Sequence, residues 1–304
     1  MMSVFSVTWI RRTGLAILPA AALLLAAPTA VADNMFTRDH GGPPEERGAL
    51  RICADPNNLP FSGAGEVGFE NKMANLFGES MELPVEFFWL PQRFGYIRAT
   101  LRSWMDNERR YRCDIMMGVP QEASGLTTST PYYYTTHMLV FKKDHPVLSE
   151  LEQSNDLLTI GLPADLKIGA FDRSPANEWL IRNGLRGHLK GYVQADGDIG
   201  FYPGKVIEGD LAEGNIDAAI IWGPIAGYYA QQVTEETGQE FTMLPMQSDV
   251  RAQFDFGVSI GVRAGDHEMM RPLQVALREH EDEIKALLDE FNVPQVDRPE
   301  RRRR

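Results

Sequence analysis

The sequence has 304 residues, a formal net charge of −12 and 43% hydrophobic residues. Its length fits roughly two domains, and its apolar content excludes a chain that is disordered throughout. The acidic balance argues against a protein that binds nucleic acid through a cationic surface.

The first 32 residues have the pattern of a secretory signal peptide. A charged pair, Arg11-Arg12, precedes an apolar run over residues 15–28, and Ala30-Val31-Ala32 has the small-x-small form of a cleavage site. A membrane-spanning helix needs about 20 apolar residues, so this run is too short for an anchor. We therefore predict that the chain is exported and cleaved after Ala32.

Two more segments are predicted to lie outside the folded body. Residues 33–48 contain the run Gly41-Gly42-Pro43-Pro44, which predicts a flexible lead-in. Residues 293–304 form a basic tail that ends in consecutive arginines, 301–304. The tail is interpreted either as a solvated terminus or as an electrostatic handle for an acidic partner.

The chain has two cysteines, Cys53 and Cys113. In an oxidising compartment two thiols favour a disulfide, and two buried free thiols are the alternative. Neither cysteine has a second Cys or a His at metal-ligand spacing, so we expect no structural zinc site.

Short apolar runs alternate with amphipathic segments in the first half of the body. Apolar pairs repeat every four residues from 96 to 105 and predict a helix there. An earlier helical face is formed by Phe69, Met73, Leu76 and Phe77. Strands are predicted around these helices over residues 50–54, 85–90 and 114–118. This alternation indicates a parallel sheet with right-handed crossovers.

The second half repeats this order. Ser174 and Pro175 predict the start of a helix that ends at Gly184, and Pro224 begins another. Buried strands are predicted over residues 167–171 and 217–222.

Two patterns follow toward the end of the body. Residues 254–262 alternate between apolar and other residues, which predicts a strand with one buried face. The last helical stripe is predicted to face the core and consists of Met270, Leu273, Leu277, Ile284, Leu288 and Phe291.

Ligands of such sheets bind beyond the carboxyl ends of the strands. The loops there combine amide side chains with aromatic rings, as recognition clefts do. The predicted cleft residues are Asp55, Asn57, Asn58, Phe61, Trp89, Gln92, Arg93, Phe94, Gln121, Tyr132, Tyr133, Ser174, Asn177 and Trp222.

Several of these residues have a structural alternative. Asp55 either faces the cleft or caps the Asn57-Asn58 turn through its own backbone. Arg93 either holds a carboxylate of a ligand or partner, or pairs with Glu70 or Glu122. The aromatic residues form a wall of the cleft or belong to the ordinary core.

The sequence shows no catalytic pattern. It has neither a nucleophile motif nor a phosphate-binding glycine loop. Asp196-Gly-Asp198 has the start of a calcium loop, but Ile207 stands where that loop needs Glu. We therefore expect a protein that is not an enzyme and holds no metal of its own.

Six short motifs occur in order along the body: CADPNNLPFS at 53–62, GFENK at 68–72, WLPQR at 89–93, RCD at 112–114, MGVP at 117–120 and WGP at 222–224. Together they resemble the accessory proteins of quinoprotein dehydrogenases, the MxaJ and XoxJ type. This group is a branch of the type II periplasmic solute-binding proteins.

The resemblance implies an α/β fold with two lobes around a cleft, joined by two crossing strands near residues 137–142 and 255–262. Lobe 1 would comprise residues 49–141 and 255–292, and lobe 2 residues 142–254. In this fold the first and third strands are neighbours, so the resemblance implies a Cys53–Cys113 disulfide.

The resemblance also implies a function in the periplasm. The expected partner is a methanol dehydrogenase that uses pyrroloquinoline quinone (PQQ) with calcium or a lanthanide, together with its cytochrome c. The PQQ and the metal belong to the partner, and we expect no tightly bound cofactor in this chain. The alternative is a carrier of PQQ, an organic acid or a metal chelate for an ABC importer.

One departure from amino-acid-binding members of the superfamily affects the ligand. Those members carry an Arg after the third strand and an Asp near the end of the strand that matches 220–222. Here residues 119–125 contain no cation, and Trp222-Gly223 replaces the Asp. A bound zwitterion would lose its hydration, and no charged side chain would compensate for that loss, so we expect no amino-acid ligand.

Overall fold

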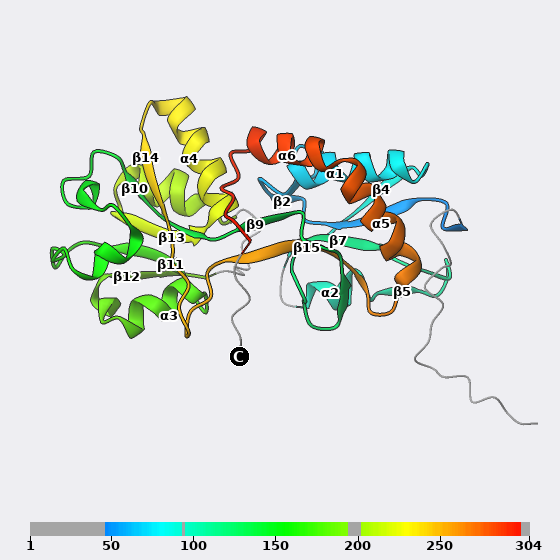
Figure 1. Cartoon of the computed structure of the whole chain (residues 1–304), viewed down its shortest axis with the longest axis horizontal. Helices are drawn as coiled ribbons and strands as arrows, with labels where there is room; N and C mark the ends of the chain where they lie inside the picture. The colour runs from blue at the N-terminus through cyan, green and yellow to red at the C-terminus, as the bar shows by residue number, and fades with distance from the viewer. Residues whose placement is uncertain (1–45, 93–94, 194–201, 299–304) are drawn as a thin grey trace, which may run out of the picture. The chain divides into compact units, whose positions relative to one another are not determined.

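The structure, a computed structural model, describes residues 46–92, 95–193 and 202–298. The predicted signal peptide, residues 33–45 of the predicted lead-in, Arg93, Phe94, the Asp196–Asp198 loop and residues 301–304 lie outside the described residues. Two large β-sheets with packed helices, together with two small hairpins, form the described body (Figure 1).

The first sheet contains the parallel strands predicted from the first half of the sequence. β1 (Leu50–Ala54) pairs in parallel with both β4 (Val85–Trp89) and β7 (Ile115–Pro120), which confirms that prediction. β15 (Phe256–Arg263) pairs antiparallel with β7. Two shorter strands also pair with β15, namely β8 (Leu126–Thr128) and β9 (Tyr133–Thr135).

Both faces of the first sheet are covered. Helices α1 (Phe69–Ser80), α5 (His267–Glu279) and α6 (Glu281–Glu290) pack on one face, and the short α2 (Tyr96–Ala99) packs on the other. The prediction of a single buried face for β15 is therefore wrong, because its residues are covered on both sides. The predicted apolar stripe does lie in the core, divided between α5 and α6.

The predicted helix over residues 96–105 is wrong in its second half. Helix α2 ends at Ala99, because the backbone of Thr100 has left the helical region, with φ −117° and ψ −91°. The next residues form a hairpin of β5 (Trp104–Met105) with β6 (Arg110–Tyr111). The rings of Trp104 and Tyr111 pack edge to face across this hairpin, with centroids 4.9 Å apart. A four-residue periodicity does not reveal such a cross-strand contact.

The second sheet has the strand order β12, β11, β13, β10, β14. Helices α3 (Pro175–Arg182) and α4 (Gly223–Thr237) lie on opposite faces of it (Figure 1). Its strands are β12 (Leu189–Tyr192), β11 (Ile168–Phe171), β13 (Ala218–Trp222), β10 (His137–Lys142) and β14 (Phe241–Pro245).

The chain crosses between the sheets twice, next to the residues predicted for the crossings. It leaves the first sheet between β9 and β10, at Thr136, and returns between β14 and β15 over residues 246–255. Strand β10, which we placed at the end of lobe 1, is hydrogen bonded in the second sheet because it pairs with β13 and β14.

The remaining elements are short. A hairpin of β2 (Asn57–Asn58) and β3 (Ser62–Gly63) follows β1. Short helical turns cover Leu148–Glu150, Ser154–Leu158, Leu185–His188 and Val206–Leu211. Within the described ranges, no helix is long and apolar enough to cross a membrane.

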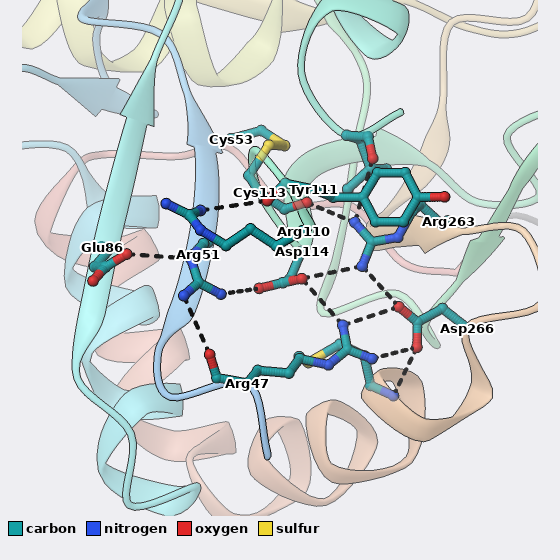
Figure 2. A network of polar contacts seen from close by, with 12 residues as sticks. Arg47, Arg51, Cys53, Glu86, Arg110, Tyr111, Cys113, Asp114, Arg263 and Asp266 are labelled. Carbon is teal, nitrogen blue, oxygen red and sulfur yellow. Dashed lines mark hydrogen bonds and ion pairs between the residues drawn. A yellow bond between two sulfur atoms is a disulfide. The ribbon is translucent and has the colours of Figure 1, made fainter. Parts of the chain in front are cut away.

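A buried ion network joins the start of the described chain to the first sheet (Figure 2). Arg47 Nη1 lies 3.1 Å from Asp114 Oδ1, and its Nη2 lies 2.8 Å from Asp266 Oδ1. Arg263 Nη2 lies 3.0 Å from an oxygen of each of the same carboxylates. The lead-in prediction is thus wrong for Arg47, which is 8% exposed because it neutralises these carboxylates.

The network determines the charge state of Asp266. Burial acts to raise the pKa of this carboxyl, but its hydrogen bond from Arg47 and the charges of Arg47 and Arg263 outweigh burial. The pKa of Asp266 is therefore below its usual range, and the carboxylate stays ionised. It also caps α5 by accepting a hydrogen bond from Met269 N at 3.2 Å.

The disulfide prediction is confirmed. Cys53 in β1 and Cys113 just before β7 are bonded, with their Cα atoms 5.3 Å apart (Figure 2). The carbonyl oxygen of Cys113 accepts a 2.6 Å hydrogen bond from Arg263 Nη1. The disulfide therefore lies directly beside the ion network.

Candidate functional site

A cavity of about 250 Å³ lies between residues of the first sheet and residues of β13 and α4. The predicted cleft residues that line it are Asp55, Asn57, Asn58, Phe61, Gln92 and Trp222. Five of them follow the carboxyl ends of β1 and β4 in the first sheet, where ligands of parallel sheets bind, and Trp222 is the last residue of β13 in the second sheet.

Other predicted cleft residues do not line this cavity. Trp89 stacks on Phe87 with ring centroids 5.0 Å apart and packs against the core. Tyr133 is 3% exposed and belongs to the same core. Gln121 is absent from the lining, and Arg93 and Phe94 lie outside the described residues.

Ser174 and Asn177 organise helix α3 instead of lining the cavity. Ser174 Oγ accepts a hydrogen bond from Asn177 N at 3.2 Å, with Pro175 in the first turn, so the predicted helix start is confirmed. The Asn177 side chain lies 3.5 Å from Asp172 Oδ1.

Asp55 has the structural role that was its alternative interpretation. Its Oδ1 accepts a 2.8 Å hydrogen bond from Asn57 N, and its Oδ2 accepts a 2.6 Å hydrogen bond from Gln92 N. The carboxylate therefore fixes two loops at the cavity, while Asp55 also contributes to the lining. Each oxygen retains a further acceptor position.

Glu70 is the functional candidate that the sequence prediction missed. It lies in the first turn of α1, lines the cavity and is 8% exposed. Its Oε1 accepts a 3.1 Å hydrogen bond from the Tyr132 hydroxyl, which accepts one at 3.2 Å from Gly118 N. Tyr132, a predicted cleft residue, thus positions Glu70 and is not itself in the lining.

The surroundings of Glu70 determine its pKa and leave space for its carboxyl. Burial raises its pKa to about 8, although the hydrogen bond from Tyr132 acts to lower it. Gly118 has φ +71°, and a Cβ at this position would lie 2.8 Å from Glu70 Oε1. A glycine is therefore needed both for the backbone conformation and for the space that the carboxyl occupies.

The motif GFENK contained the signal that could have identified Glu70. Phe69 and Met73 of this helix are 0% exposed, so the face beside them is turned inward. Helical spacing alone did not distinguish a carboxyl at the edge of that face from one in solvent.

The cavity is acidic and partly aromatic. Within the described part of the chain, its charged lining residues are Asp55 and Glu70, without a lysine or arginine. Trp222 packs on Phe256 with ring centroids 4.4 Å apart, and its Nε1 is buried without a hydrogen-bond partner. The described residues also contain no cluster of three or more His, Cys, Asp or Glu that could hold a metal ion.

Glu70→Gln should change how stability depends on pH. The native pKa lies above the ordinary value of 4.5, so the native state keeps a proton that the unfolded chain releases. The contribution of Glu70 to wild-type stability should therefore be fully present below about pH 4.5 and fall as pH rises toward 8, by roughly 2–3 kcal/mol between pH 5 and pH 7.

The neutral variant should lack this decline. Urea unfolding at several pH values tests it, with the exposed Glu66→Gln as the matched control, which should follow the wild type. Parallel pH profiles for wild type and Glu70→Gln would contradict the assignment of Glu70 as a buried acid.

Comparisons with known proteins place this fold. No protein-family model matches the chain. Protein MoxJ of Methylorubrum extorquens is 26% identical over 308 residues, covering 93% of this chain and 96% of MoxJ. The crystal structure of MxaJ from Methlophaga aminisulfidivorans MPT, 22% identical, has a TM-score of 0.65 over 82% of this chain and 100% of that one.

A third comparison shows the family as well as the fold. The crystal structure of the periplasmic binding protein XoxJ from Methylobacterium extorquens AM1 is 30% identical to this chain, with a TM-score of 0.64. The match covers 82% of this chain and 99% of XoxJ. The chain therefore belongs to the XoxJ/MxaJ-type family of periplasmic binding proteins, with the type II fold that the motifs implied.

Proposed function

We propose that this chain is a non-catalytic periplasmic accessory protein of a PQQ-dependent methanol dehydrogenase. It binds the dehydrogenase, or a segment of it, in or near the cavity and assists its maturation or activation. The observation that carries the proposal is the match over 99% of XoxJ, together with the function that the motifs imply. The signal pattern of residues 1–32 supports export, with cleavage after Ala32.

The size and charge of the cavity favour a protein partner over a carried small molecule. Its volume of about 250 Å³ is below the ~300–1,000 Å³ usual for small-molecule sites. PQQ and organic acids carry carboxylates, and the described lining offers them Asp55 and Glu70 but no cation. Burying a further carboxylate there is unfavourable.

Contacts of the segment after α6 also argue against a carrier that opens freely. The segment after α6 is bonded on both sides: Asn292 Nδ2 donates to Gly227 O of α4 at 2.8 Å, and Thr135 Oγ1 donates to Pro294 O at 2.7 Å. A Cβ at Gly227 would overlap Asn292 O. This strap joins the two sheets, whereas an importer's carrier must open and close.

Size-exclusion chromatography with light scattering tests the proposed function. The exported chain and its cognate dehydrogenase should co-elute as one complex at low salt. A chain that ends at Arg298 serves as the matched variant, because it lacks residues 299–304 with the terminal arginines. Weaker co-elution of this variant at physiological salt would assign a role to the tail. Separation of the full chain from the dehydrogenase at both salt concentrations would overturn the proposal.

A further inference from the structure

The cavity combines an apolar lining with carboxyl groups. Phe61, Met117, Trp222 and Ile225 contribute apolar side chains, and Asp55 and Glu70 contribute the acids. A ligand that fits must therefore have an apolar stem and a polar end that two carboxyl groups favour.

The geometry points to a lysine side chain of the partner protein as the group that enters this cavity. Its aliphatic stem would lie against the apolar residues and its ammonium beside Asp55 and Glu70. This inference rests on the proposed function, and it names the chemistry by which the partner is recognised.

The size of the cavity supports a single side chain. At about 250 Å³ it is smaller than the sites of free small molecules, but a lysine brings an unbranched stem and a compact charge. A guanidinium would instead require a planar fork of acceptors. The rings of Phe61 and Trp222 in the lining add favourable faces for a cation.

The acceptors in the cavity match an ammonium. Asp55 uses each oxygen for one backbone hydrogen bond, to Asn57 N and Gln92 N, and an ionised carboxylate offers about four acceptor positions. Among the described residues, the Glu70 carboxyl accepts a side-chain hydrogen bond from the Tyr132 hydroxyl alone. An ammonium has three hydrogen-bond donors and no acceptor, so all of its donors can pair with the free acceptor positions of these oxygens.

Binding of a cation should release a proton from Glu70. The groups that face this carboxyl are Asp55, Tyr96, Tyr132 and Tyr133, and burial raises the pKa of each tyrosine well above its usual value. Glu70 is therefore the group that titrates near neutral pH, with a pKa of about 8. Affinity for a cation should rise with pH toward 8, approaching tenfold per pH unit.

The first experiment uses a small probe that does not depend on the dehydrogenase. n-Butylammonium is titrated into the full chain by calorimetry at pH 6, 7 and 8, with butanol as the uncharged and butyrate as the anionic counterpart of the same length. Butylammonium should bind more tightly than both, and more tightly as pH rises. Glu70→Gln should weaken it about tenfold and flatten the pH profile, whereas Glu66→Gln should change neither. Equal binding of butanol, tighter binding of butyrate, or no saturable binding of butylammonium would overturn the inference.

A second experiment separates this inference from the proposed function. The dehydrogenase is acetylated on its lysines, which removes their charge, and its co-elution with the chain is compared with that of the unmodified enzyme. Loss of binding on acetylation and in Glu70→Gln is expected. If wild type and Glu70→Gln bind both forms equally, the lysine inference fails while the proposed function stands. If even the unmodified enzyme does not bind, the proposed function fails, whatever the butylammonium titration gives.

Discussion

Arg263→Met should lower the free energy of unfolding by about 3–5 kcal/mol, because it leaves buried carboxylates short of a positive partner. The Arg263 side chain is 4% exposed and bridges Asp114 and Asp266, whose side chains are 6% and 0% exposed. Its guanidinium carbon also lies 4.2 Å from the centre of the Tyr111 ring. Methionine keeps much of the apolar bulk but supplies neither the charge nor the hydrogen bonds.

The matched control is an exposed ion pair of the same chain. Lys143 and Glu240 lie 2.9 Å apart with side chains 61% and 62% exposed, and such pairs contribute about 0–1 kcal/mol. Urea unfolding of Arg263→Met and Lys143→Met, followed by circular dichroism, compares the two. Equal losses in both variants would contradict the role assigned to the network.

The network also predicts how acid affects the protein. The folded pKa of Asp266 lies below its usual value of 3.8, so the stability that this carboxylate contributes is present above about pH 4. It is lost as pH falls through the folded pKa. Arg263→Met removes one of the charges that lower this pKa, so the acid-dependent part of the stability should shrink in the same variant.

Much of the fold could be predicted because its signals are local. The strand at 50–54 and the helix that begins at Pro175 depend on apolar runs and on a capping residue a few positions away. Trp104 is a residue for which a local pattern was misleading. It continues the four-residue repeat that begins at Tyr96 and predicted a helix, but it pairs with Tyr111 across a hairpin.

No local sequence pattern predicts the buried ion network. Arg47 stands at the end of a segment rich in glycine and proline, which has the composition of a linker. Its partners Asp114 and Asp266 are 67 and 219 residues away. Only the arrangement of β7 and α5 in space shows that this arginine is part of the core.

The candidate site also contains residues that could be predicted from the sequence and one that could not. Asp55, Asn57, Asn58 and Phe61 could be predicted because they follow a parallel strand, and the edge of the sheet gathers such loops. Glu70 could not, because its burial depends on Tyr132 and on the missing side chain of Gly118. Packing of three separate segments buries this carboxyl, and burial raises its pKa, so no single segment of sequence contains the cause.

Removal of the Cys53–Cys113 disulfide should cost about 4 kcal/mol. The bond closes a loop with a sequence separation of 60 residues, and the chain-entropy estimate for a loop of this length gives that value. Replacement of both cysteines with alanine avoids burial of new polar groups at positions that are 4% and 0% exposed. Urea unfolding of this double variant measures the loss, and the intact mass of the wild type, two hydrogens lighter than the dithiol, confirms the bond.

The disulfide and the ion network should not contribute independently. Cys113 O accepts a hydrogen bond from Arg263 Nη1 at 2.6 Å, and Asp114 is the next residue in the chain. The bond between Cys53 and Cys113 thus holds the strand that presents Asp114 to both arginines. Combining Arg263→Met with the alanine pair should cost less than the sum of the separate losses, since neighbouring sites share their effects. Losses that add within about 0.5 kcal/mol would show instead that hydrogen bonding within the sheet holds this strand in place without the disulfide.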